Sequence, residues 1–228
     1  MPEGTPFADA HTHSPERRAG VLRVCNIPRS SWDGKLEQLA PFCAGLHPKE
    51  IHPETLENDL MELEGVLKLG GIAALGECGL DRLAETSMEL QTQAFQAQAK
   101  LTERLKLPLV IHCVRAFPEI IALKKKLTPS CAWIVHGFRG NAQSASELAR
   151  HGFMISFGAA LLRAQPALIE ALKTVPLEAL LLETDEAEEP IESVYAAASE
   201  LRGEGLETLK SAVSNSFRKT FRLGNLLG

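Results

Sequence analysis

Residues 108–136, PLVIHCVRAFPEIIALKKKLTPSCAWIVH, place a helical pattern between two short apolar runs. The runs Leu109–Ile111 and Ala132–Val135 have the length of strands, and a histidine follows each of them directly. A helix between two strands is typical of a parallel strand pair joined by a crossover. His112 and His136 are therefore expected at equivalent ends of two parallel strands.

The same alternation extends over the whole chain. Six further apolar runs are strand candidates, namely Phe7–Ala10, Val21–Cys25, Cys43–Leu46, Ile72–Leu75, Phe153–Phe157 and Leu180–Leu182. Helical periodicity fits Glu54–Lys68, Ser87–Leu105, Pro118–Leu127, Ala142–Arg150, Pro166–Lys173, Glu192–Arg202 and Leu206–Phe221. Eight strands interleaved with helices predict an α/β fold, the parallel (β/α)8 or TIM barrel.

The first unit of this predicted barrel is irregular. Only residues 11–20 separate the first two apolar runs. A crossover with its helix needs at least about 10–12 residues. We therefore expect the first crossover helix to be missing.

Composition restricts the class of protein. The 228 residues are 45% hydrophobic and contain no linker or repeat, so we expect one domain over residues 1–228. The net charge of −5 argues against purely electrostatic binding of polyanions, although bound cations can supply a local positive field. Five cysteines without a C-x-x-C pair predict reduced thiols. No apolar run approaches the about 18 residues of a membrane span. We expect a cytoplasmic protein with no membrane association and no obligate protein partner.

Polar residues of one chemical kind lie at the ends of the predicted strands. They are His11 and His13 after the first run, His47 after the third, Glu77 after the fourth, His112 after the fifth, His136 after the sixth and Asp185 beyond the eighth. Parallel barrel strands all point one way, so these groups are expected at the same C-terminal rim, where barrel enzymes keep their chemistry.

Any one of these residues has an ordinary explanation. The His11-Thr12-His13 pair alone is weak evidence for a metal, and a lone strand-end histidine is more often a core or capping residue. A glutamate such as Glu77 is seldom buried without a partner. Asp9, two residues before His11, is either a structural carboxylate or one that supports a ligand.

Together the donors exceed what one tetrahedral cation requires. They predict two divalent ions about 3.5–4 Å apart, bridged by Glu77. His11, His13 and Asp185 are expected to hold one ion, and His112 and His136 the other. Imidazoles favour Zn²⁺, whereas carboxylates tolerate Mg²⁺ or Mn²⁺, so the sequence does not choose among these ions.

The residues resemble the TatD family of metal-dependent deoxyribonucleases within the amidohydrolase superfamily. The ordered motifs that carry this resemblance are Asp-Ala-His-Thr-His, Gly-Leu-His-Pro, Gly-Glu-Cys-Gly-Leu-Asp, Leu-Pro-Leu-Val-Ile-His-Cys, Val-His-Gly-Phe-Arg-Gly, Ile-Ser-Phe-Gly and Leu-Leu-Glu-Thr-Asp. The resemblance implies a barrel, a divalent-metal centre and hydrolysis of DNA phosphodiesters, often from an end. It implies metal ligands at the same six positions, and it places His47 near the substrate.

The chain departs from the family pattern in three places. The first crossover helix is missing, and Arg82-Leu83 replaces the aromatic residue that commonly follows Gly-Leu-Asp. After Leu-Glu-Thr-Asp the family usually has a small residue, Pro and an aromatic, followed by a basic loop. Here Glu186, Glu188 and Glu189 intervene, and these acids would repel DNA.

Basic residues also recur near the strand ends, where they could contact phosphate oxygens. They are Lys49, Arg82, Arg115, Arg139 and Arg163. With His47, the first four of these are the predicted substrate-binding residues.

The leading functional hypothesis is a metal-dependent phosphodiesterase that acts on DNA. Asp185 would orient the attacking water and accept its proton, and Glu77 would also be catalytic through the metals. Two alternatives remain open: hydrolysis of a small lactone, amide or ester, and a metal-binding scaffold without activity.

Overall fold

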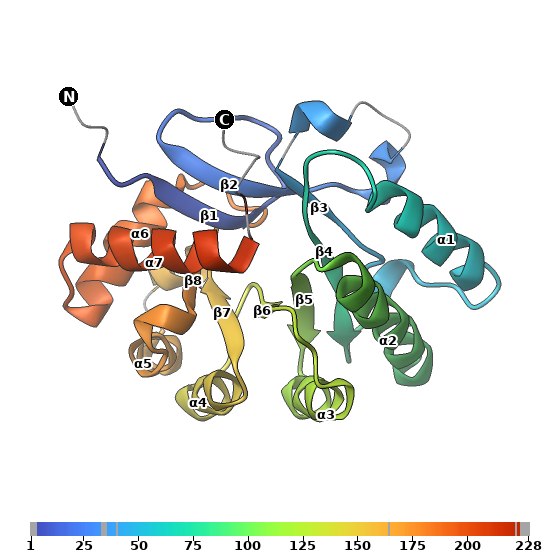
Figure 1. Cartoon of the computed structure of the whole chain (residues 1–228). Coiled ribbons are helices and arrows are strands. Elements are labelled where there is room, and N and C mark those ends of the chain that lie inside the picture. The colour runs from blue at the N-terminus through green and yellow to red at the C-terminus, as the bar shows by residue number, and fades with distance from the viewer. Residues whose placement is uncertain (1–3, 33–35, 40, 164, 222, 224–228) are drawn as a thin grey trace. The chain divides into compact units, whose positions relative to one another are not determined.

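The computed structural model describes residues 4–32, 36–39, 41–163, 165–221 and 223 (Figure 1). The chain divides into two compact units. The terminal unit contains residues 1–25 and 136–222, and the central unit contains residues 26–135 and 223–228. The expectation of a single domain over residues 1–228 stays a prediction.

The central unit is built on four parallel strands in chain order. They are β3 (Phe42–Ala44), β4 (Ile72–Asp81), β5 (Leu109–Val114) and β6 (Trp133–Val135). The helices α1 (Leu56–Val66), α2 (Met88–Leu105) and α3 (Phe117–Leu127) follow β3, β4 and β5 (Figure 1). The core between sheet and helices is fully buried, and the rings of Phe95 and Trp133 pack edge to face with centroids 5.2 Å apart.

Strand β4 is longer than its apolar run predicts. It continues past Leu75 to Asp81, with a register shift between Leu75 and Cys78 against β5. Gly79 has a φ of +157°, and a Cβ there would collide with the carbonyl oxygen of His112. The absence of a side chain lets the two backbones approach closely. Glu77 therefore lies within the strand, where the sequence had placed it at the end.

The terminal unit also contains four parallel strands. Strand β7 (Phe153–Phe157) pairs with β8 (Leu180–Leu182), and β1 (Phe7–Thr12) pairs with β2 (Val21–Asn26), of which the residues up to Cys25 belong to this unit. Thr12 forms a bridge with Asp185 just beyond β8, so β1 lies beside β8. The helices are α4 (Ala142–Arg150), α5 (Pro166–Thr174), α6 (Ile191–Arg202) and α7 (Leu206–Phe221).

The missing first crossover helix is confirmed. Residues 13–20 connect β1 to β2 without a helix. The other connections begin helices where the sequence expects them. Ser87 and Asn141 cap α2 and α4 by accepting hydrogen bonds from the backbone N–H groups of Leu90 and Ser144.

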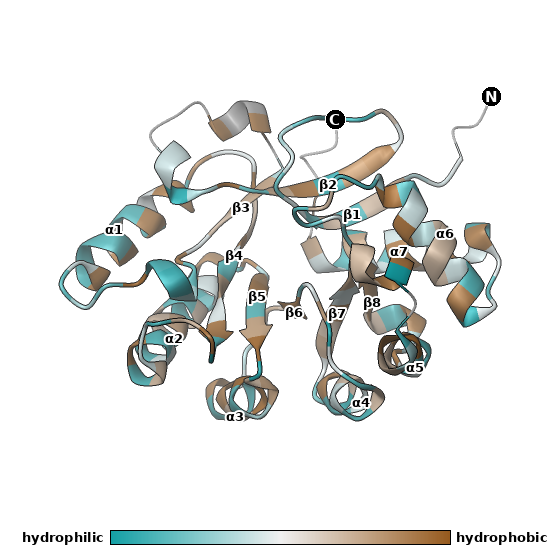
Figure 2. Cartoon of the chain, turned by 180° about the vertical axis from the view of Figure 1, so that it is seen from behind, coloured by the Kyte–Doolittle hydropathy of each residue, from teal (hydrophilic) through white to brown (hydrophobic). Residues whose placement is uncertain are grey.

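Hydropathy follows the architecture of each unit. The strands are mostly hydrophobic, whereas the helices carry hydrophobic and hydrophilic residues on different sides (Figure 2). Across the described residues, no helix is both long and apolar enough to cross a membrane. The five cysteines are free thiols, in agreement with the sequence expectation.

Candidate metal centre

His11, His13 and Asp185 come together in the terminal unit. Asp185 Oδ1 lies 3.7 Å from His11 Nε2 and 3.5 Å from His13 Nε2. One possible ligand atom from each residue lies within 4.8 Å of the other two. Two backbone hydrogen bonds fix this arrangement, because Asp185 N–H donates to the His11 carbonyl at 2.9 Å and His13 N–H donates to the Asp185 carbonyl at 3.0 Å. This grouping agrees with the ligand set predicted for the first ion.

Asp9 holds the end of β8 against β1. Its carboxylate accepts hydrogen bonds from the backbone N–H of Thr184 at 2.9 Å and from the hydroxyl of Thr184 at 2.7 Å. The hydroxyl oxygens of Thr184 and Thr12 also lie within hydrogen-bond distance, 2.8 Å apart. Burial raises the pKa of Asp9 to about 7 against the lowering effect of these hydrogen bonds. Asp9 is thus a structural carboxylate that sets the position of the residue before Asp185.

Glu183 is a site residue that the sequence reasoning missed. It is fully buried, and its Oε1 accepts a hydrogen bond from the Gly137 N–H at 2.5 Å. The same oxygen lies 3.6 Å from His136 Nδ1. Metal-bound histidines commonly have a carboxylate or carbonyl behind the second ring nitrogen, which fixes the orientation of the ring. The only signal in the sequence is a glutamate directly after the apolar run Leu180–Leu182.

The central unit brings together a second set of donors. His112 Nδ1 lies 3.0 Å from Glu77 Oε1, and His47 Nε2 lies 3.6 Å from the same oxygen. The rings of His47 and His112 have centroids 4.5 Å apart. Ligand atoms of these three residues also lie within 4.8 Å of one another. The sequence predicts that His47 lies near the substrate. Its distance from Glu77 would also allow it to bind the same metal ion as Glu77 and His112.

A hydrogen bond distinguishes His47 from His112. The Lys49 backbone N–H donates to His47 Nδ1 at 3.2 Å, so the neutral imidazole carries its proton on Nε2. A protonated nitrogen cannot ligate a metal, but it can donate to an oxygen. This tautomer favours the predicted role of His47 as a donor near the substrate over a role as a ligand.

Asp81 is a second site residue that the sequence reasoning missed. It is 2% exposed at the end of β4, and its Oδ2 lies 3.2 Å from His112 Nε2. The Leu83 N–H donates to Oδ1 at 2.8 Å. Burial acts to raise the pKa of Asp81, but the Leu83 and His112 hydrogen bonds and the charges of His112 and Lys49 hold it below its ordinary value. Asp81 therefore stands behind His112 as Glu183 stands behind His136.

The predicted substrate-binding cations lie in different surroundings. Lys49 Nζ is 3.7 Å from Asp81 Oδ2, and Arg82 forms an ion pair with Glu119. Arg115 is exposed with a φ of +54°. Arg139 lines a cavity of the terminal unit together with Arg163 and Asp185.

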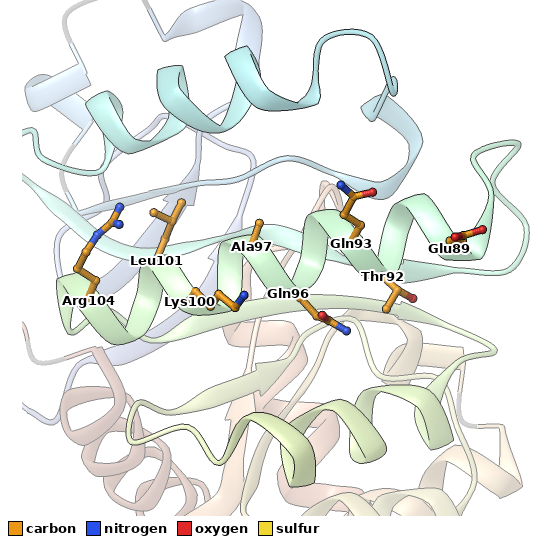
Figure 3. A pocket seen from close by; sticks show the side chains of 8 residues that line it. All are labelled: Glu89, Thr92, Gln93, Gln96, Ala97, Lys100, Leu101 and Arg104. Carbon is orange, nitrogen blue, oxygen red and sulfur yellow. The ribbon is translucent and has the colours of Figure 1, made fainter.

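Another hollow runs along α2 between Glu89 and Arg104 and contains none of the predicted site residues (Figure 3).

The six predicted ligands are divided between the two units. His11, His13, His136 and Asp185 belong to the terminal unit, whereas Glu77 and His112 belong to the central unit. A Glu77 that bridges two ions would share them with residues of the terminal unit. This bridging role stays a prediction.

Comparison with known proteins identifies the family. Residues 21–222 match the family described as TatD related DNase. The chain is 30% identical over 237 residues to the "3'-5' ssDNA/RNA exonuclease TatD" of Edwardsiella piscicida, with 91% of this chain and 90% of that protein covered. It is 31% identical over 154 residues to the "Deoxyribonuclease Tat-D" of Schizosaccharomyces pombe, with 62% of this chain and 49% of that protein covered.

A solved structure gives the same answer for the fold. The TatD homologue YjjV of Escherichia coli superposes with a TM-score of 0.80 at 26% identity, and the match covers 95% of this chain and 98% of that one. The predicted (β/α)8 barrel class is thereby confirmed. The family match over most of the chain leads to one conclusion: this chain belongs to the TatD related DNases, a family of metal-dependent hydrolases.

Proposed function

We propose that the protein is a divalent-metal-dependent phosphodiesterase that acts on DNA or another nucleic acid. The observation that carries the proposal is the terminal-unit group of His11, His13 and Asp185, whose ligand atoms lie within 4.8 Å of one another. Two relatives support the substrate class, since their names describe a deoxyribonuclease and an exonuclease of single-stranded DNA and RNA.

The chemistry of the donors fits divalent cations. Two imidazole nitrogens and one carboxylate are donors that Zn²⁺ and Mn²⁺ accept readily. We propose two ions: His11, His13 and Asp185 would hold one, His112 and His136 would hold the other, and Glu77 would be shared between them. The Glu183 carboxylate would orient His136, and the Asp81 carboxylate would orient His112.

Each side chain has a separate task in the proposed hydrolysis. Bound divalent cations lower the pKa of water and polarise a phosphoryl oxygen. Asp185 is partly exposed, with 32% of its side chain accessible, so it can reach the attacking water and accept its proton. His47 would donate its Nε2 proton in a hydrogen bond to a phosphate oxygen. Arg139 and Arg163 would neutralise the phosphate charge.

We also infer a cytoplasmic location, because five cysteines without a disulfide suit a reducing compartment.

The test is a hydrolysis panel with added Mg²⁺, Mn²⁺ or Zn²⁺. Its substrates are end-labelled single- and double-stranded DNA, RNA, a chromogenic phosphodiester and a lactone. We expect metal-dependent cleavage of the phosphodiesters that is lost in His11→Ala and retained in His151→Ala, a histidine at the end of α4. Turnover of the lactone without phosphodiester cleavage would contradict the proposal. Stoichiometric metal without any turnover would support the inactive scaffold.

A further inference from the structure

A cavity of about 300 Å³ lies in the terminal unit, in the loops that follow β6, β7 and β8. Its lining is mostly polar, and small or apolar residues such as Gly137, Phe138, Gly158 and Ala159 form the rest. Its volume is at the lower end of the range of about 300–1,000 Å³ for small-molecule sites. The cavity therefore has room for about one nucleoside, and a longer substrate would extend beyond it.

One oxygen of a buried carboxylate in the lining has no hydrogen-bond partner among the described residues. Glu183 is fully buried, and its Oε2 has no hydrogen-bond partner in the described part of the chain. A Cβ on Gly158 would lie 3.4 Å from Glu183 Cγ, and one on Gly137 would lie 3.7 Å from Oε1. The two glycines keep the space beside this carboxylate open. A buried acceptor in that position calls for a donor group on a ligand.

The charges around the cavity are mixed and predominantly negative. Arg139 and Arg163 form no ion pair with any residue that the structure describes, and neither do Glu186 and Glu189. With Glu183 and Asp185, four carboxylates face two guanidinium groups. Two guanidinium groups match one phosphate, whereas the buried Glu183 carboxylate matches a hydroxyl or amino donor. A second phosphate of a continuing chain would meet the exposed pair Glu186 and Glu189.

We propose that this cavity is a specificity subsite that receives one nucleoside and restricts the substrate to short phosphodiesters of about dinucleotide length. Glu186 and Glu189 are the determinants that disfavour a longer anionic chain. The proposal deepens the proposed function and rests on it, because the bond to be cleaved is a phosphodiester. Glu188, which has the same charge in the same loop, does not line the cavity and provides a matched control.

The test compares the deoxyadenosine dinucleotide with a 20-residue oligodeoxyadenylate at low ionic strength. We expect the wild type to have the higher kcat/KM for the dinucleotide. The double variant E186Q/E189Q should raise kcat/KM for the 20-mer by about tenfold and change that for the dinucleotide by less than about twofold. E188Q should change neither, and added salt should reduce the gain. Circular dichroism and thermal unfolding would verify that all variants fold.

A binding measurement separates this proposal from the proposed function. Isothermal titration calorimetry with uncleavable methylenephosphonate analogues of both substrates measures their binding affinity in the absence of hydrolysis. Tighter binding of the dinucleotide analogue by the wild type, with the preference reduced in E186Q/E189Q, supports the subsite even if no variant hydrolyses a phosphodiester. That lack of hydrolysis would contradict the proposed function alone. An unchanged length preference in E186Q/E189Q, or a wild-type preference for the 20-mer, would overturn the subsite.

Discussion

Replacing Asp81 with asparagine tests whether a buried carboxylate fixes the tautomer of His112, a proposed metal ligand. Asp81 accepts from Leu83 N–H through Oδ1 and faces His112 Nε2 with Oδ2 at 3.2 Å. A cation bound at His112 Nδ1, which lies 3.0 Å from Glu77, would leave the imidazole proton on Nε2, where the Asp81 carboxylate accepts it. Asparagine keeps the acceptor for Leu83 but turns an NH2 donor toward Nε2. The proton of the imidazole then moves to Nδ1, which blocks the ligand atom.

The expected effect is a loss of metal affinity, because Asp81 would support the metal ligand His112. Removal of such partners costs about 10–100-fold in metal affinity, or about 1.4–2.7 kcal/mol. Titration of the folded protein with Mn²⁺ or Zn²⁺ against a competing chelator measures it. Asp59→Asn is the control, because Asp59 is 3% exposed and pairs with Arg29 at 2.5 Å in the same unit but belongs to none of the donor groups. It should lose stability and keep its metal affinity. Wild-type metal affinity in a folded Asp81→Asn protein would refute the reasoning.

Two further substitutions test the donors themselves. Glu77→Ala should lower the bound metal and abolish hydrolysis. His47→Ala should leave the metal content largely intact, because His47 is expected to donate to the substrate. Elemental analysis of both variants measures this, and full metal occupancy in Glu77→Ala would contradict the role of Glu77 as a ligand. Asp185→Asn keeps the shape and a carbonyl donor but cannot accept a proton, so it should retain much of its metal while its rate falls by about 10²–10⁴-fold. Near-normal turnover by metal-loaded Asp185→Asn would remove Asp185 as the base.

The fold was predictable because its periodicities are strong. The α2 helix begins one residue after the predicted Ser87 and ends at the predicted Leu105. The sequence predicts strand length less well, because an apolar run marks only the part of a strand that is buried in the core. Strand β5 continues to Val114 and β4 to Asp81, past polar residues that the sequence reasoning had placed outside the strands. Glu77 and His112 among them belong to a candidate donor group, so a polar residue after an apolar run does not by itself mark the end of a strand.

The candidate site was predictable in part for a related reason. Strand ends mark the residues that face the rim and predict that His11, His13 and Asp185 lie together, which the structure shows; their role as ligands stays a prediction. No sequence pattern singles out Asp81 and Glu183. A carboxylate that supports a histidine can be recognised only from the contact that the two residues make in the folded chain. Each lies 31 or 47 residues from its histidine in the sequence. Spacing alone cannot reveal a pair of that kind.

The short connection between β1 and β2 explains how the site tolerates the missing crossover helix. Arg23, on the buried part of β2, donates to the carbonyl oxygens of Ser14 and Pro15, each at 2.7 Å. Arg18 adds a two-pronged ion pair with Glu192 at the start of α6, at 3.0 and 2.7 Å. A crossover helix would otherwise hold this stretch by packing. The two arginines hold the backbone that follows His13. Hydrogen bonds and an ion pair thus keep the second histidine of the pair in position, where a crossover helix would do so by hydrophobic packing.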